Sequence, residues 1–152
     1  MNKSGWLALV VTLAVARVVA GSVGVGAENQ GSVKEFVVAL PDGIESARRV
    51  VLELSEVRLP KKAAVVFRAR GIEEDGVEVP LGSVGLLAHS NEAEGTVLHA
   101  ALRIDVTKTM KRWQQDHPGV VAMRIRVIPY AGAEPLANLE WSVESAALTL
   151  PN

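Results

Sequence analysis

The stretch VLHAALRIDVTKTMKRWQQ, residues 97–115, decides the fold because the spacing of its apolar side chains changes once along its length. In its first half, over 97–104, apolar residues alternate with other residues, as in a strand with one buried face. The residues expected on that buried face are Leu98, Ala100, Leu102 and Ile104. We therefore predict a half-buried strand here.

The second half of the same stretch has the spacing of a helix. Val106, Met110 and Trp113 are four and three positions apart, so they share one face of a helix over 105–115. Pro118 ends this helix, because proline cannot donate a backbone hydrogen bond and disfavours helical geometry in the residue before it. We expect one helix of about three turns.

Short alternating segments on both sides of the helix indicate a β-rich domain. They are 33–40, 50–59, 63–70, 77–81, 83–89, 121–127 and 139–150. The most regular of them places Val121, Met123, Ile125 and Val127 on one face. In the second the alternation slips near Glu56, which predicts a bulge or a twist. About seven to nine short strands at this spacing predict an all-β fold, an antiparallel β-sandwich of jelly-roll or Greek-key type with one short helix.

Residues 1–27 have the pattern of a secretory signal peptide. Lys3 gives the start a positive charge, a run of apolar residues follows, and small residues leading to Ala27 form a cleavage site. The alternative is an uncleaved anchor, in which Arg17 would lie within the apolar segment. Cleavage predicts a secreted or periplasmic protein with no membrane association.

The chain after the signal peptide divides into two parts. Residues 28–46 are expected to form a leader with the first strand, and residues 47–152 are expected to form the β-sandwich domain. Lysine and arginine together number 16, against 17 aspartate and glutamate residues, and the basic residues are spread along the chain. A nucleic-acid-binding surface is therefore not expected.

The residue types offer no metal site and no cofactor site. There is no cysteine, so neither disulfides nor thiolate ligands are available. The three histidines, His89, His99 and His117, are well separated in sequence, whereas a type-3 copper ion needs three histidines of its own.

The remaining candidates for a catalytic or ion-binding site are a group of carboxylates and two serines. Glu73, Glu74 and Asp75 lie together between glycines, but their spacing does not match a calcium-binding loop, and adjacent carboxylates in a loop are usually solvated. Ser83 and Ser90 lack the glycine-flanked turn of a nucleophilic serine. The sequence therefore predicts no catalytic site, and the chain is not expected to be an enzyme.

The aromatic residues bear on carbohydrate binding, in which sugar rings stack on exposed aromatic rings. The spacing of Trp113 and Trp141 places both on inward faces, which indicates core packing. Tyr130 follows a proline in a predicted turn and is the aromatic residue expected to be exposed. A single exposed ring does not form a sugar-binding platform.

Four segments, in this order, carry a resemblance to a known family. They are VPLGSVGLLAH at 79–89, LRIDVTK at 102–108, VIPYAG at 127–132 and VESAAL at 143–148. Together they make residues 47–150 similar to the C-terminal domain of plant-type polyphenol oxidases, of the tyrosinase and catechol oxidase class. At the position of the Lys-Phe-Asp-Val motif of that family, only Phe67 is shared.

The resemblance implies a function through a partner. In that family the domain packs over a dicopper (type-3) site whose histidines all belong to another domain. The chain is thus expected to be an exported, non-catalytic accessory domain that shields or assists a separate dicopper oxidase. Loops at one end of the sandwich are expected to contact the partner. The candidate contact residues are Glu73, Glu74, Asp75, Ser90, Asn91 and Glu92. The alternative is a carbohydrate- or surface-binding β-sandwich module.

Overall fold

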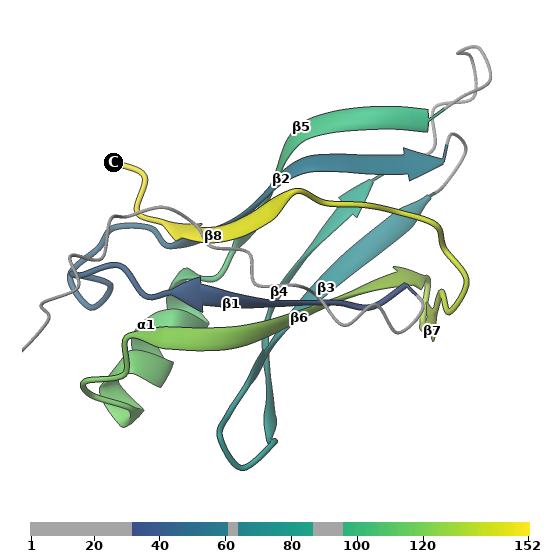
Figure 1. Ribbon diagram of the computed structural model, residues 1–152. Coiled ribbons are helices and arrows are strands. Elements are labelled where there is room, and N and C mark those ends of the chain that lie inside the picture. Colours follow the sequence, from purple (N-terminus) through teal and green to yellow (C-terminus); the bar gives the residue numbers. More distant parts are fainter. Residues whose placement is uncertain (1–31, 61–63, 87–95) are drawn as a thin grey trace, which may run out of the picture.

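A computed structural model describes residues 32–60, 64–86 and 96–152, and it shows two antiparallel sheets packed face to face with one helix (Figure 1). The elements are β1 (Lys34–Ala39), β2 (Val51–Pro60), β3 (Val65–Ile72), β4 (Glu78–Leu86), β5 (Thr96–Asp105), α1 (Thr107–Asp116), β6 (Ala122–Ala131), β7 (Glu134–Pro135) and β8 (Ser145–Thr149). The predicted all-β sandwich with one short helix is confirmed. The expected signal peptide, 1–27, lies outside the described residues.

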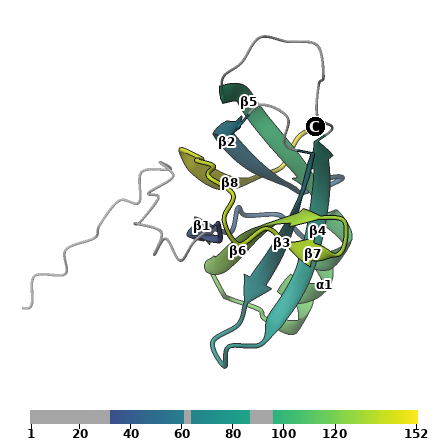
Figure 2. The same ribbon diagram turned by 90° about the vertical axis from the view of Figure 1, so that its right-hand side faces the viewer.

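The large sheet has the strand order β1, β6, β3, β4, with β7 paired to the end of β6, and the small sheet has the order β5, β2, β8. β3 and β4 pair in the large sheet, whereas β2 and β5, which flank them along the chain, pair in the small sheet. Such non-consecutive neighbours are typical of Greek-key and jelly-roll sandwiches. Figure 2 shows the two layers from a second direction.

The first strand belongs to the sandwich. β1 pairs with β6 from Lys34 opposite Val127 to Ala39 opposite Ala122. The folded unit therefore includes this strand, which the division of the sequence at residue 47 had placed with the leader.

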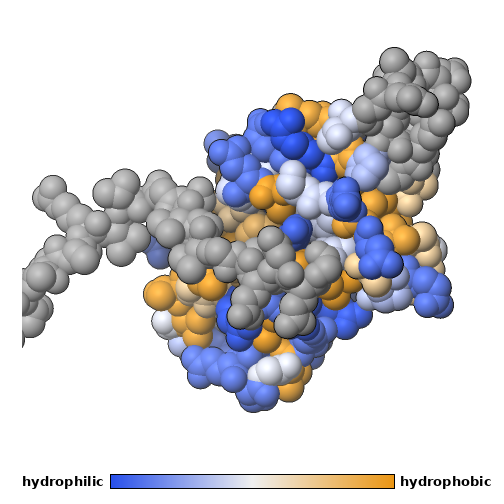
Figure 3. All heavy atoms as spheres, turned by 45° about the vertical axis from the view of Figure 1, so that its right-hand side comes forward, coloured by the Kyte–Doolittle hydropathy of each residue, from blue (hydrophilic) through white to orange (hydrophobic). Residues whose placement is uncertain are grey.

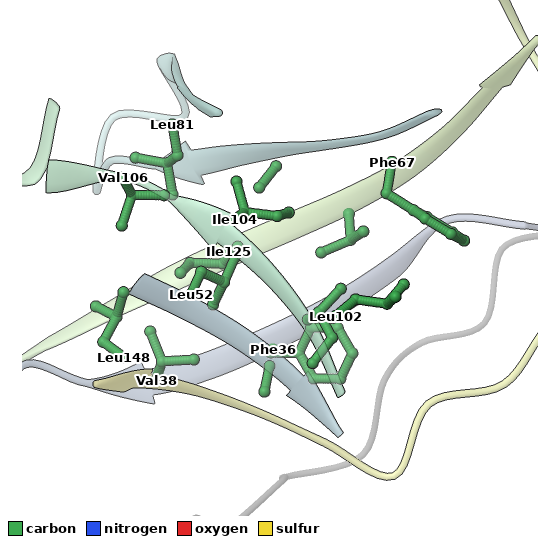
Figure 4. Close-up of a cluster of buried hydrophobic side chains, with 14 of the residues drawn as sticks. Phe36, Val38, Leu52, Phe67, Leu81, Leu102, Ile104, Val106, Ile125 and Leu148 are labelled. Atoms are coloured by element: carbon green, nitrogen blue, oxygen red, sulfur yellow. The ribbon is translucent and has the colours of Figure 1, made fainter. Parts of the chain in front are cut away.

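The core forms between the sheets from the alternating residues of the strands. Figure 4 shows side chains from both sheets pointing toward one another. Fully buried examples are Leu52, Leu54, Phe67, Ile104, Met110 and Ile125. Trp113 and Trp141 are buried as predicted, with 7% and 6% of their surfaces exposed.

The slip in alternation expected near Glu56 is present and has a consequence for β5. Glu56 is the one residue other than glycine, among those described, with a positive φ, at 53°. The buried side chains on either side of it, Leu54 and Val57, are three positions apart. Because β5 stays in register across this point, Leu98 faces the exposed Arg58, and 47% of its surface is exposed. The prediction that Leu98 lies in the core was therefore wrong.

Val121 is the second residue that was predicted to be buried and is exposed, at 76%. It lies just before β6, which begins at Ala122. The other three residues of its predicted face, Met123, Ile125 and Val127, are buried. The alternation was therefore assigned correctly, and only its first residue falls outside the strand.

Residues 77–81 and 83–89 were expected to form two short strands around Gly82, but β4 is one strand with a bulge at this point. Residues 87–89 lie outside the described residues. Ala69 pairs with Gly82 and the next residue, Arg70, pairs with Pro80, so Leu81 is the extra residue. Gly82 lies close to the end of β5. A Cβ atom on Gly82 would be 2.8 Å from Ile104 Cγ2 and 2.9 Å from the Asp105 carbonyl oxygen. The glycine therefore allows β4 and β5 to approach.

The predicted helix is confirmed, but it begins two residues later than expected because Asp105 is still paired with Val51 in β5. The Asp105 carboxylate accepts hydrogen bonds from the backbone N–H and the hydroxyl of Thr107, at 3.1 and 2.7 Å. These bonds, that of the Thr107 hydroxyl above all, hold the pKa of Asp105 below its ordinary value. α1 packs against β4.

Candidate interaction cleft

A cleft of about 640 Å³ opens at the end of the large sheet next to α1. The pairing of β3 with β6 ends at Ile72 opposite Arg124. After Ile72 the chain leaves β3 and forms the loop of Glu73, Glu74 and Asp75, which we call the acidic loop. On the neighbouring strand, Val120 and Val121 lead into β6. The cleft lies where these two segments diverge, and residues of both line it.

The acidic loop is a tight turn held by hydrogen bonds across its base. The N–H of Glu73 donates to the Val77 carbonyl, and the N–H of Gly76 donates to the Glu73 carbonyl, both at 2.9 Å. The Asp75 carboxylate accepts a hydrogen bond from the Val77 N–H at 3.0 Å. Gly76 has a φ of 84°, in the left-handed region that favours glycine. The exposed carboxylates of Glu74 and Asp75 are thus held on an ordered turn at the rim of the cleft.

Glu73 joins the acidic loop to the end of α1. Its Oε1 accepts a hydrogen bond from Trp113 Nε1 at 3.2 Å, and His117 Nε2 lies 3.7 Å from the same oxygen. The His117 ring stacks on the Trp113 ring, with centroids 4.4 Å apart and planes 15° apart, and its Nδ1 lies 2.9 Å from the Trp113 carbonyl oxygen. The three side chains therefore form one contact between the loop and the helix. Glu73 is therefore a structural anchor, whereas Glu74 and Asp75 are exposed.

The opposite wall of the cleft is apolar. Val37 of β1 and Val120, just before β6, are 49% and 36% exposed, and both line the cleft together with Ile72 and Met123. On the face shown in Figure 3, hydrophobic residues lie scattered among hydrophilic ones. Single exposed valines are ordinary on protein surfaces. The distinguishing feature here is that two of them lie in one cleft opposite an acidic rim.

The second predicted contact loop and one of the three histidines belong to a segment outside the described residues. They are Ser90, Asn91 and Glu92 of the loop, and His89. His99 lies opposite the buried Val57 and is half-buried. Within 32–60, 64–86 and 96–152, no group of three or more histidine, aspartate or glutamate side chains is placed to hold a metal ion.

Tyr130 was expected to be the exposed aromatic residue, and this prediction was wrong. It belongs to β6, only 7% of its surface is exposed, and the Arg68 guanidinium lies over its ring at 4.1 Å from the centroid. Trp141 packs on Phe67 in the core, with ring centroids 4.7 Å apart. None of Tyr130, Trp113 and Trp141 therefore presents a flat exposed ring.

The outer face of the large sheet carries a second group of charges, which sequence analysis missed. Arg126 forms ion pairs with both Glu35 and Glu78. Arg124 pairs with Glu35 at 3.1 Å, and Arg70 pairs with Glu78 at 2.8 Å. The five residues come from all four main strands, so only the sheet register brings them together. Each of these three arginines has a carboxylate partner, so their positive charges are neutralised within the network. This part of the face is therefore not an open cationic surface.

This network predicts a pH dependence. Hydrogen bonds from Arg126 and then Arg124 hold the pKa of Glu35 below its ordinary value of 4.5. A lowered pKa in the folded state means that ionised Glu35 stabilises the fold above pH 4.5, and that this contribution is lost as the pH falls through the lowered value. Glu35→Gln should therefore destabilise the protein at neutral pH, and its difference from the unsubstituted chain should shrink below pH 4.5. Urea unfolding across this range checks the prediction, and a difference independent of pH contradicts it.

No protein-family model matches this chain, and no curated protein is significantly similar to it. No helix in the described part of the chain has the length and apolar character needed to cross a membrane.

Proposed function

We propose that this chain is an exported, non-catalytic accessory module that binds a partner protein through the cleft beside the acidic loop. The observation that carries the proposal is that one cleft is lined both by two exposed carboxylates and by exposed apolar side chains. The carboxylates are those of Glu74 and Asp75, and the apolar side chains are those of Val37 and Val120. Protein-binding surfaces commonly combine an apolar centre, which supplies affinity, with a charged rim, which supplies orientation.

The partner that we propose is a separate dicopper oxidase. Support comes from the resemblance of residues 47–150 to the domain that shields the copper site in polyphenol oxidases, and from the position of the acidic loop at one end of the sandwich. Export through the signal peptide at 1–27 would bring the chain to an oxidase outside the cytoplasm.

The experiment is an inhibition assay with a dicopper oxidase from the same organism. Increasing amounts of the chain should lower catechol oxidation to a plateau, because a bound cap occupies the mouth of the copper site. The double variant Glu74→Lys with Asp75→Lys should associate more slowly than the unsubstituted chain, and the difference should be larger at low salt.

A matched control variant separates the effect of changing the acidic loop from the effect of changing the net charge of the chain. Glu134 and Glu140 are exposed acidic residues that do not line the cleft, and Glu134 lies beyond the end of β6 farthest from it. Glu134→Lys with Glu140→Lys changes the net charge by the same amount and should leave inhibition unchanged. If no dicopper oxidase of the organism binds or is inhibited, the oxidase is not the partner.

In the part of the chain that the structure describes, the tryptophans and the tyrosine are not exposed for the ring stacking that carbohydrate binding would use. Trp113 and Trp141 are buried, and Arg68 covers Tyr130. A platform of stacked sugar rings therefore has no basis in these three residues.

A further inference from the structure

We infer that the cleft recognises an extended, basic segment of the partner that carries a bulky apolar residue between basic ones. This inference rests on the proposed binding function and specifies the chemistry of the partner. Three independent features of the cleft support it, namely its backbone, its apolar wall and its charged rim.

The backbone of the cleft offers an unused pairing position. Ala122 has a register partner in β1, Ala39, but none in β3, because the pairing of β3 with β6 stops at Arg124. The Leu40 N–H donates to the Val121 carbonyl at 2.9 Å, so the backbone groups of Val121 point toward β1. Since these directions alternate along an antiparallel strand, the N–H and C=O of Ala122 point to the other side, into the cleft. An extended chain entering there can pair with them, as in strand addition to a sheet edge.

The walls specify the side chains of that segment. Val37, Val120 and Met123 provide an apolar lining, and a volume of about 640 Å³ lies in the range of pockets that accept a small ligand or a bulky side chain. Glu74 and Asp75 at the rim favour basic neighbours on either side of the apolar anchor. Arg124 also lines the cleft, but its charge is paired with Glu35, so the carboxylates dominate the rim.

The test is calorimetric titration of the full chain with three synthetic peptides. The first is acetyl-Gly-Arg-Leu-Arg-Gly-amide; the second replaces leucine by serine; the third carries a methyl group on the leucine nitrogen. We expect one saturable site for the first peptide and at least about tenfold weaker binding for the second, which lacks the apolar anchor. The third should also bind at least about tenfold more weakly, because it cannot donate to the Ala122 carbonyl.

Variants of the protein locate the site. The double variant Glu74→Lys with Asp75→Lys should bind the first peptide about tenfold or more weakly than the unsubstituted chain does. The charge-matched double variant Glu134→Lys with Glu140→Lys should change the affinity for that peptide by less than about twofold. Val37→Thr should weaken binding, whereas Val77→Thr, at an exposed valine that does not line the cleft, should not. All six positions are exposed, so these variants are expected to fold.

The outcomes separate this inference from the proposed function. Peptide binding with the expected losses supports the inference whether or not an oxidase is inhibited. Equal affinity for the leucine and serine peptides, or equal effects of the two charge-reversal variants, overturns it. If the oxidase is inhibited through the acidic loop and the peptides do not bind, the proposed function stands and the extended basic segment is wrong.

Discussion

Replacing Ile125 by alanine is expected to lower the free energy of unfolding by about 2–5 kcal/mol, because it opens a cavity between the two sheets. Ile125 is fully buried in β6, and Figure 4 shows it among the core side chains. Strands of both sheets hold the surrounding side chains in place, so the cavity cannot collapse fully. Urea unfolding followed by far-ultraviolet circular dichroism measures the loss.

Arg124→Ala, one position earlier on the same strand, is the matched control. Its side chain is 59% exposed and its ion pair with Glu35 lies at the surface, where such pairs contribute about 0–1 kcal/mol. Equal losses for Ile125→Ala and Arg124→Ala would mean that the two faces of β6 are assigned the wrong way round.

Gly82→Ala is expected to destabilise the fold by about 1–3 kcal/mol through overpacking. The added methyl group would lie 2.8 Å from Ile104 Cγ2 and 2.9 Å from the Asp105 carbonyl oxygen. The backbone oxygen belongs to the last residue of β5, so it cannot rotate away as a flexible side chain can. Either the bulge in β4 or the end of β5 must therefore shift. Thermal unfolding of both proteins under the same conditions gives the difference.

Gly85→Ala provides the comparison on the same strand. A Cβ atom at this position would have Val66 Cγ2 as its nearest neighbour, at 3.9 Å, which is ordinary van der Waals contact. Little loss of stability is expected. If Gly85→Ala is as costly as Gly82→Ala, the close approach of β4 to β5 is not the reason that glycine is needed at position 82.

The fold could be predicted because the side-chain period is a local property. The alternation in β6 and the helical spacing of Met110 and Trp113 identified the correct buried faces. Leu98 was misassigned because the alternation of β2 changes at Glu56, which has a positive φ. Beyond that point Leu98 of β5 is paired with the exposed Arg58 and not with a buried residue. The alternation within β5 itself does not reveal this change. Tyr130 was misassigned because its cover, Arg68, comes from another strand.

The candidate site could be predicted only in part. The cluster of carboxylates at Glu74 and Asp75 is visible in the sequence, and so is its position in a loop. The contact of Glu73 with Trp113 joins residues 40 positions apart, and the exposed Val37 comes from β1. Their meeting depends on where the pairing of β3 with β6 stops, which is a property of the sheet register.

The most direct test of binding at the cleft is a nuclear magnetic resonance titration of the ¹⁵N-labelled chain with acetyl-Gly-Arg-Leu-Arg-Gly-amide. Saturating shifts are expected in the Trp113 indole N–H, the Ala122 amide and the amides of the acidic loop, with little change at Arg68 or Arg70 on the outer face of the large sheet. Shifts centred on those arginines, or no saturating shift at Ala122, would contradict the account.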